Sequence, residues 1–144
     1  NIKDLDTQLP LASFNAIVTN PPYKKECTGI PNEAYTKFIA RHEMACNLED
    51  IIRVSSKLLE DKGEFYMVHR PERLVDILSL LRCYQLEPKV LRFVQGKVER
   101  RPKLVLIKAV RNAGVFLEVQ SPLIIYQQNG EYTEEMKEIQ RKKE

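Results

Sequence analysis

The feature that most constrains the fold is a short apolar run, Phe14–Thr19, that ends abruptly at Asn20-Pro21-Pro22. The run is rich in apolar and β-branched residues on both faces, which is typical of a buried strand in a parallel sheet. Two consecutive prolines then remove two amide donors, so the hydrogen-bond ladder cannot continue. We therefore expect an α/β protein in which this strand delivers Asn20 to one edge of a sheet.

The rest of the chain alternates between helical and strand periodicity. Asn47 is a suitable helix cap, Lys62-Gly63 a suitable helix stop, and Pro71 a suitable first residue of a second helix. This order predicts an α/β fold with a late antiparallel hairpin. The expected elements are strand Phe14–Thr19, helix Leu48–Glu60, strand Phe65–Val68, a helix from Pro71 that ends before Pro88, strands Val90–Val94 and Leu104–Val110, short strands Phe116–Val119 and Leu123–Tyr126, and a charged helix or tail over Thr133–Glu144.

Apolar side chains recur at helical spacing and define the expected core. The apolar face of the second helix includes Val75 and Ile77, and Phe65 and Met67 lie in the strand between the two helices. The full set of expected core residues is Met44, Leu48, Ile51, Ile52, Ser55, Leu58, Leu59, Phe65, Met67, Leu74, Val75, Ile77, Leu78, Leu81 and Tyr84.

Composition narrows the class of protein. The 144 residues are 43% hydrophobic and 30% charged, which fits one globular domain or a large piece of one and excludes collagen-like and disordered classes. The apolar stretches are too short to cross a membrane, and the first ten residues do not resemble a signal peptide. Three widely spaced cysteines, Cys27, Cys46 and Cys83, indicate neither a disulfide framework nor a metal site, and are read as small buried residues. We expect a cytoplasmic protein without a metal.

Positive charge is concentrated in one segment. The net charge is only +3, but the segment Lys97–Arg111 carries six cations and a single acid, Glu99. Such a cluster is typical of a phosphate-binding surface, or alternatively of a solvated loop and strand face. The six cations are Lys97, Arg100, Arg101, Lys103, Lys108 and Arg111.

Asn20-Pro21-Pro22-Tyr23 places polar acceptors and an aromatic ring where open α/β sheets bind ligands, beyond the carboxyl end of a strand. The side-chain oxygen of Asn20 and the carbonyl of Pro21 can both accept hydrogen bonds from one planar amino group. Tyr23 can stack on the ring that carries this amine, which contributes about 1–3 kcal/mol for a base. The motif favours an enzyme that positions an amine for reaction. The structural alternative is a strand-ending turn on which Tyr23 packs as a lid.

The motif Ile17-Val18-Thr19-Asn20-Pro21-Pro22-Tyr23 resembles motif IV of S-adenosylmethionine-dependent methyltransferases that modify amino groups. The resemblance extends from Phe14 over nearly the whole chain and is most specific to the bacterial tRNA (adenine-N6)-methyltransferase "small domain" family. It is also carried by Ile39-Ala40-Arg41-His42-Glu43, Leu48-Glu49-Asp50-Ile51-Ile52-Arg53-Val54, Val68-His69-Arg70-Pro71-Glu72-Arg73-Leu74, Leu86-Glu87-Pro88-Lys89 and Asn129-Gly130-Glu131-Tyr132-Thr133.

The resemblance implies a Rossmann-like class I methyltransferase fold, of which this chain is the second half, with strands in the order 4-5-7-6. The family binds S-adenosylmethionine through a glycine-rich loop and an acidic residue that lie upstream, and none of the five glycines here is paired as Gly-x-Gly. We therefore expect residues 1–144 to be the C-terminal, substrate-binding part, inactive without an upstream cofactor-binding half. One further departure, Asn15 where the family usually has Asp, is remote from the expected chemistry.

The resemblance, the strand ends and the charge cluster together suggest roles for individual residues. Asn20, Pro21, Pro22 and Tyr23 are the expected catalytic residues, and Asn20 also borders the cofactor. Expected substrate contacts are Arg41, His42, His69, Arg70, Lys97, Arg100, Arg101 and Lys103. For His69 and Arg70, which close a strand at the same sheet edge as Asn20, capping and packing of the next helix is the alternative. For Arg41 and His42 the alternative is a solvated loop.

Three functions remain open from the sequence. The first is methylation of an exocyclic amino group of adenine in tRNA, with RNA as the partner. The second is methylation of glutamine in a release factor, since that enzyme family shares Asn-Pro-Pro-Tyr. The third is a non-catalytic RNA-binding or oligomerising module. Because strand Phe14–Thr19 would lack its upstream neighbour, we also expect self-association through this exposed sheet edge.

Overall fold

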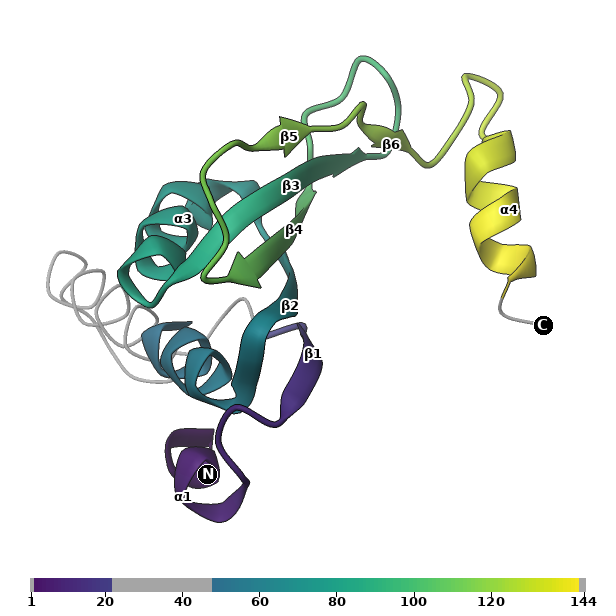
Figure 1. The fold of residues 1–144 in the computed structure, drawn as a ribbon. Helices are drawn as coiled ribbons and strands as arrows, with labels where there is room; N and C mark the ends of the chain where they lie inside the picture. The colour runs from purple at the N-terminus through teal and green to yellow at the C-terminus, as the bar shows by residue number, and fades with distance from the viewer. Residues whose placement is uncertain (1, 22–47, 143–144) are drawn as a thin grey trace, which may run out of the picture.

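The computed structural model describes residues 2–21 and 48–142, which form a mixed sheet with helices packed against one face (Figure 1). A helix of residues 48–58 precedes β2. The other elements are η1 (Ile2–Asp4), α1 (Leu5–Gln8), β1 (Phe14–Thr19), β2 (Leu59–His69), η2 (Pro71–Arg73), α3 (Leu74–Cys83), β3 (Leu86–Gln95), β4 (Leu104–Arg111), β5 (Glu118–Val119), β6 (Leu123–Ile124) and α4 (Glu134–Arg141).

The order of the strands agrees with the α/β topology expected from the sequence. β1 lies parallel to β2, whereas β2 and β3 each lie antiparallel to β4, so the order is β1-β2-β4-β3. This corresponds to the order 4-5-7-6 that the resemblance implies, and it confirms the late antiparallel hairpin. The two-residue strands β5 and β6 both run parallel to β3 along its outer side.

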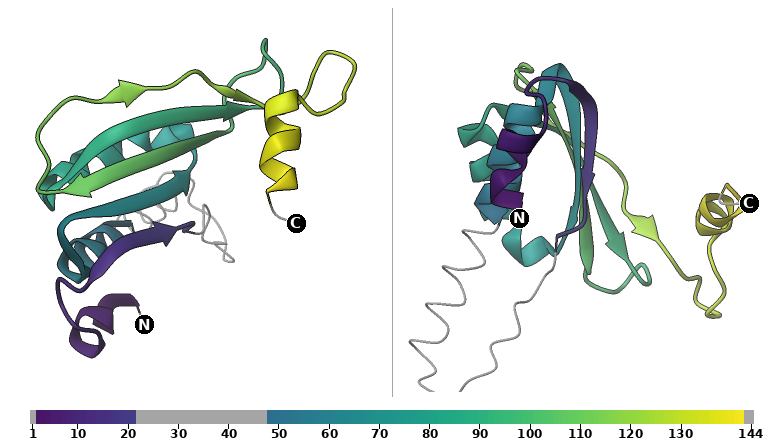
Figure 2. Two further views of the ribbon diagram at one scale, coloured as in Figure 1. Left: turned by 45° about the vertical axis from the view of Figure 1, so that its right-hand side comes forward. Right: turned by 90° about the horizontal axis from the view of Figure 1, so that it is seen from below.

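The core lies between the sheet and the helix of residues 48–58 together with α3, which cover the same face (Figure 2). Alternate residues of β2 and β4 point into it, so that Phe65, Met67 and Ile107 are at most 2% exposed. Ile52 and Ile77 meet them from the helices and are fully buried. The apolar positions predicted from helical spacing are thus mostly confirmed. One is wrong: Val75 is 80% exposed, on the outer face of α3.

Strand β1 has the predicted bounds, but the prediction that it is buried is wrong. Val18 is 77% exposed and Phe14 is 36% exposed. These side chains are exposed because β1 is the last strand of the sheet and, among the described residues, pairs only with β2. An apolar hollow of about 250 Å³ lies beside it, lined by Leu5, Ile17, Ile51 and others.

The junction between the first helix and β2 also differs from the prediction. The helix ends at residue 58 and β2 starts at once at Leu59, so Lys62-Gly63 lies within a strand. The β1–β2 register shifts here, and Lys62 has a φ of +62°. A Cβ on Gly63 would lie 2.9 Å from the carbonyl oxygen of Glu60, so glycine is required for a close approach of the backbone.

Two smaller expectations, the start of β3 and the burial of Cys83, are also wrong. Pro88 lies inside β3, at a register shift between Pro88 and Val90, so this strand starts earlier than expected. Cys83, in the last turn of α3, is exposed rather than buried, whereas Cys27, Cys46 and Met44 lie outside the described residues.

The C-terminal segment ends in a helix that packs little against the rest (Figure 1). Thr133 caps α4 by accepting a hydrogen bond from the amide of Met136 at 3.3 Å. An ion pair of 2.6 Å between Arg92 and Glu135 ties α4 to the sheet. Within the described part of the chain, no helix is both long enough and apolar enough to span a bilayer.

Candidate functional site

The strand pairing brings Asn20 and Pro21 to the carboxyl end of β1. Thr19 is in register with Met67, two residues before the end of β2. Asn20 is exposed and Pro21 is buried, as expected for a turn that leaves the sheet at this point. Pro22, Tyr23, Arg41 and His42 lie outside the described residues.

His69 and Arg70 end the neighbouring strand at the same edge, as the sequence predicts. His69 is only 4% exposed, and its Nδ1 accepts a hydrogen bond of 2.8 Å from the amide of Arg70. An accepting Nδ1 carries a lone pair, so a neutral ring has its proton on Nε2. Burial lowers the pKa of His69, and the charge of Arg73 lowers it further. A neutral, fixed histidine and an exposed arginine therefore stand beside the turn at Asn20.

The basic connection, residues 96–103, lies farther along this same edge. His69 pairs with Val105, and Leu104 pairs with Val94, so the loop joins β3 and β4 just beyond His69. Arg100, Arg101 and Lys103 are exposed, and none of these three has an ion pair within the described ranges. The basic connection therefore presents three cations to solvent.

A buried side chain that sequence reasoning missed holds the basic connection in shape. Gln95 is 8% exposed, and its Nε2 donates to the carbonyls of Lys97 and Val98 at 3.2 and 2.8 Å. The amide of Lys103 closes the loop by donating to the carbonyl of Val94 at 2.9 Å. A glutamine at the end of an apolar strand is the signal that could have found this role, since a buried amide needs partners.

These segments converge on one edge of the sheet. In Figure 2 (left), β1, β2, β3 and β6 point to the same side, where the basic connection also lies. Neighbouring strands are about 4.8 Å apart, so β1 and β3 are separated by roughly 14 Å across the sheet, and β3 runs four residues beyond the level of Thr19. The turn at Asn20 and the exposed cations are therefore spread along one edge rather than gathered in one pocket.

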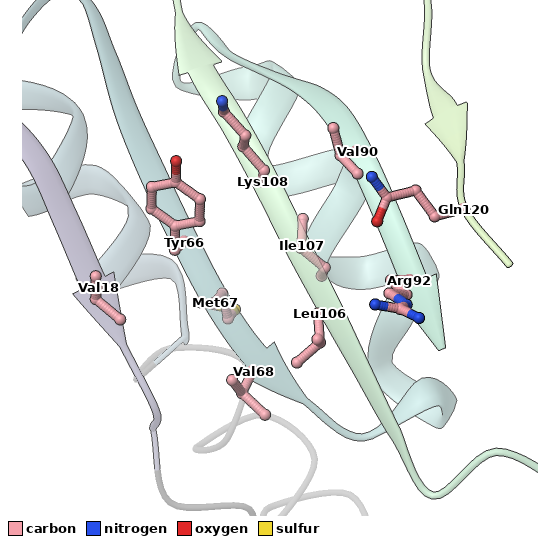
Figure 3. Close-up of a pocket in the computed structure, with 10 residues that line it drawn as sticks. All are labelled: Val18, Tyr66, Met67, Val68, Val90, Arg92, Leu106, Ile107, Lys108 and Gln120. Carbon is pink, nitrogen blue, oxygen red and sulfur yellow. The ribbon is translucent and has the colours of Figure 1, made fainter. Parts of the chain in front are cut away.

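The face of the sheet opposite the helices carries a second polar group. Tyr66 and Lys108 lie side by side on adjacent strands (Figure 3). Both line an open hollow of about 480 Å³. Lys108 lies 2.8 Å from Glu64, and the Tyr66 hydroxyl donates to the same carboxylate. Through this hydrogen bonding the pKa of Glu64 is lowered, whereas the pKa values of Tyr66 and Lys108 are raised. Glu64 pairs with both Lys108 and Tyr66, so the polar groups of this cluster bond to one another and link β2 to β4.

Among the described residues, no group of three or more His, Cys, Asp or Glu side chains is placed to hold a metal ion.

The chain is similar to curated RNA methyltransferases. Over 126 residues it is 32% identical to the tRNA1(Val) (adenine(37)-N6)-methyltransferase of Porphyromonas gingivalis, an alignment that covers 85% of this chain and 48% of that relative. Over 95 residues it is 30% identical to the protein of the same name from Parabacteroides distasonis, covering 66% of this chain and 39% of that relative. The chain thus spans less than half the length of these relatives. No family model matches it.

Solved structures share the fold. A predicted O-methyltransferase of Agrobacterium tumefaciens superposes with a TM-score of 0.73 at 16% identity, over 98% of this chain and 60% of the other. A proposed DNA modification methylase of Thermus thermophilus, solved with S-adenosyl-L-methionine, gives 0.60 at 14% identity, over 83% and 54%. The predicted family resemblance and the predicted Rossmann-like methyltransferase fold class are both confirmed.

Proposed function

We propose that this chain is the C-terminal, substrate-binding part of an S-adenosylmethionine-dependent enzyme that methylates the exocyclic amino group of adenine in tRNA. The observation that carries the proposal is the convergence of Asn20-Pro21, His69-Arg70 and the basic connection on one sheet edge. The names of the curated relatives support the same substrate. A tRNA substrate also implies a cytoplasmic location.

The chemistry follows from what an adenine amine needs. Its lone pair is delocalised into the ring, so it is a poor nucleophile unless charge on nitrogen is stabilised. The side-chain oxygen of Asn20 and the carbonyl oxygen of Pro21 accept hydrogen bonds from the two N–H groups of the amine. These bonds hold the nitrogen in line to attack the methyl group. Pro22 shapes the turn, and Tyr23 stacks on a base that has turned out of its helix. His69 and Arg70 border the same base or its phosphate.

S-adenosylmethionine would supply the methyl group when bound. Among the described residues, Asn20 is the one expected to border this cofactor. The described glycines, Gly63, Gly96, Gly114 and Gly130, are isolated from one another and form no glycine-rich turn between a strand and a helix. The described residues therefore do not build a cradle for the cofactor. We propose that the chain alone is inactive, and that the cofactor is held mainly by an upstream half.

RNA is favoured over a release factor because of the basic connection. Arg100, Arg101 and Lys103 are exposed on the edge that holds Asn20, where a polyanion would gain from them and a glutamine side chain would not.

We also propose that the isolated chain associates with a second copy through β1. This strand ends the sheet among the described residues and exposes Val18, and an exposed apolar strand at a sheet edge is a template for pairing.

A methyl-transfer assay tests the proposal and its alternatives together. The chain would be compared with a chimera in which the upstream half of the Porphyromonas gingivalis relative precedes Asn1. Each is incubated with S-adenosylmethionine and either tRNA or a glutamine-containing release-factor peptide, and products are identified by mass spectrometry. We expect N6-methyladenosine in tRNA from the chimera only. Methylated glutamine would support the release-factor alternative. A folded, cofactor-binding chimera that methylates neither substrate would support a non-catalytic module.

A further inference from the structure

A small turn near the C-terminus stacks two tyrosines beside the basic connection. Tyr126 and Tyr132 form an isolated antiparallel bridge, and their rings lie 5.3 Å apart at an interplanar angle of 16°. Two hydrogen bonds close the turn. The amide of Gln127 donates to the carbonyl of Glu131 at 2.8 Å, and the amide of Thr133 donates to the carbonyl of Ile125 at 3.0 Å. The two rings are therefore held in a fixed stack.

This turn is joined to the basic connection by three hydrogen bonds. The amide of Tyr126 donates to the carbonyl of Gly96 at 2.8 Å, and Lys97 Nζ donates to the carbonyl of Gln128 at 3.3 Å. Gln128 Nε2 in turn donates to Glu99 at 2.9 Å. The turn that carries the stacked rings is thus attached to the loop that carries the exposed cations, at the end of the sheet edge where β6 runs parallel to β3.

The electrostatics of this surface favour an anionic partner. Glu99 is the only acid of the basic connection, and the hydrogen bond from Gln128 lowers its pKa, with Lys97 and Arg100 adding to the effect. Glu99 therefore stays ionised, and the exposed Glu131 beside Tyr132 adds a second acid, but the four cations Lys97, Arg100, Arg101 and Lys103 outnumber these two acids.

The rings themselves are accessible. Tyr126 is 40% and Tyr132 is 37% exposed, and neither contributes to the hydrophobic core. Exposed aromatic faces next to cations are the combination with which proteins bind single-stranded nucleic acid, because every base can stack and every phosphate can pair. A duplex offers phosphates but no free base face.

We propose that Tyr126, Tyr132, Arg100, Arg101 and Lys103, here called the tyrosine–arginine surface, bind a single-stranded segment of RNA. An unpaired base stacks on the tyrosine pair while flanking phosphates contact the cations. The inference rests on the proposed function only in taking RNA as the substrate class. It places the tyrosine pair four strand spacings, roughly 19 Å across the sheet, from the strand that ends at Asn20. It requires neither the cofactor nor methyl transfer.

The test measures binding of an eight-nucleotide single-stranded RNA, a matched duplex RNA and an acidic peptide to the 144-residue chain. The double variant Tyr126→Leu/Tyr132→Leu should weaken single-strand binding by roughly 10- to 100-fold with little change in salt dependence. It should change duplex binding much less. Tyr132→Phe keeps the ring and should bind within about twofold of wild type. Unchanged single-strand affinity in the double variant, or equal losses for duplex and single strand, would overturn the proposal.

A second variant keeps the test decisive if the leucine substitutions disturb the turn. The chain contains no tryptophan, so Tyr132→Trp introduces a single indole reporter on the proposed surface. A stacked base should quench its emission when single-stranded RNA is added, and duplex RNA should not. Absence of quenching at saturating RNA, or quenching by the acidic peptide instead, would contradict the proposal. If the RNA-binding results are as expected but the methyl-transfer assay gives no product, the proposed function is contradicted and this inference is not.

Discussion

Strands β1 and β2 are parallel neighbours whose paired segments are both largely apolar, yet they differ sharply in how well the fold supports them. In register, Ile17 of β1 lies beside Phe65 of β2, which is fully buried, and Val18 lies beside Tyr66. β2 has a partner on both sides, whereas β1 has one among the described residues. The strand that carries Asn20 is therefore the less supported of the two. Stability resides in the inner strands, and the expected chemistry resides at an edge.

The largest expected effect comes from making the same substitution on each strand. Phe65→Ala should cost about 3–5 kcal/mol of unfolding free energy, because it empties a site that the helices and sheet enclose. Phe14→Ala, at a side chain that is 36% exposed, should cost about 1 kcal/mol. Denaturant unfolding of both variants measures this difference. Equal costs would mean that β1 is as well packed as β2.

A second prediction separates recognition from stability. Replacing Arg100, Arg101 and Lys103 by Ala should weaken RNA binding and reduce the slope of log affinity against log salt by roughly 2, since fewer counterions are released. Unfolding free energy should change by less than about 0.5 kcal/mol, because these side chains are exposed. Lys62→Ala is the control, as it removes an exposed cation near the opposite end of β2. An unchanged slope in the triple variant would mean that these three cations take no part in RNA binding.

A third prediction concerns the free edge of β1. Val18→Lys places a charge at an exposed position of this strand, which opposes pairing with another chain. Sedimentation velocity should show less association than for wild type, while stability changes little. Val75→Lys, at an exposed position on α3, should leave association unchanged. If both variants associate as the wild type does, β1 is not the contact.

The smallest expected effect is a pH dependence at His69, where β2 meets the candidate site. Burial lowers its folded-state pKa below the ordinary value of 6.5, so the unfolded chain binds more protons between the two values. Stability from the neutral ring is complete above pH 6.5 and falls as the pH drops below it toward the folded-state pKa. The fall in unfolding free energy from about pH 7 to about pH 5.5 should be smaller in His69→Gln. An identical pH profile in that variant would show that His69 titrates alike in both states.

Much of the fold could be predicted because local patterns specify it. The prolines after Thr19 define the end of β1, and alternating burial along β2 and β4 follows from their apolar positions. The apolar pattern of β1 predicted burial and was wrong, because burial depends on which strand ends the sheet; its place at an edge was expected only from the family resemblance. Val75 was assigned to the wrong face of α3, since an apolar residue near a helix start fits either side of the stripe.

The sequence predicted the shared edge of Asn20 and His69, because the ends of parallel neighbouring strands meet there. That the basic connection lies at this edge depends on the antiparallel pairing of β4 with β2 and β3. Gln95 and the Tyr126–Tyr132 stack were missed because both depend on contacts made when a loop or turn closes, and on the register of β6. No periodicity in the sequence reports such contacts.

The central claim is that the carboxyl end of β1 holds the amine that is methylated. It is tested most directly by the turnover of Asn20→Ala in the chimera with the upstream half, measured as N6-methyladenosine formed in tRNA. Asn15→Ala, near the other end of the same strand, is the matched control. We predict a loss of roughly 10²–10³-fold for Asn20→Ala, with RNA and cofactor affinities changed far less, and turnover near wild type for Asn15→Ala. Near-wild-type turnover in Asn20→Ala would contradict the claim.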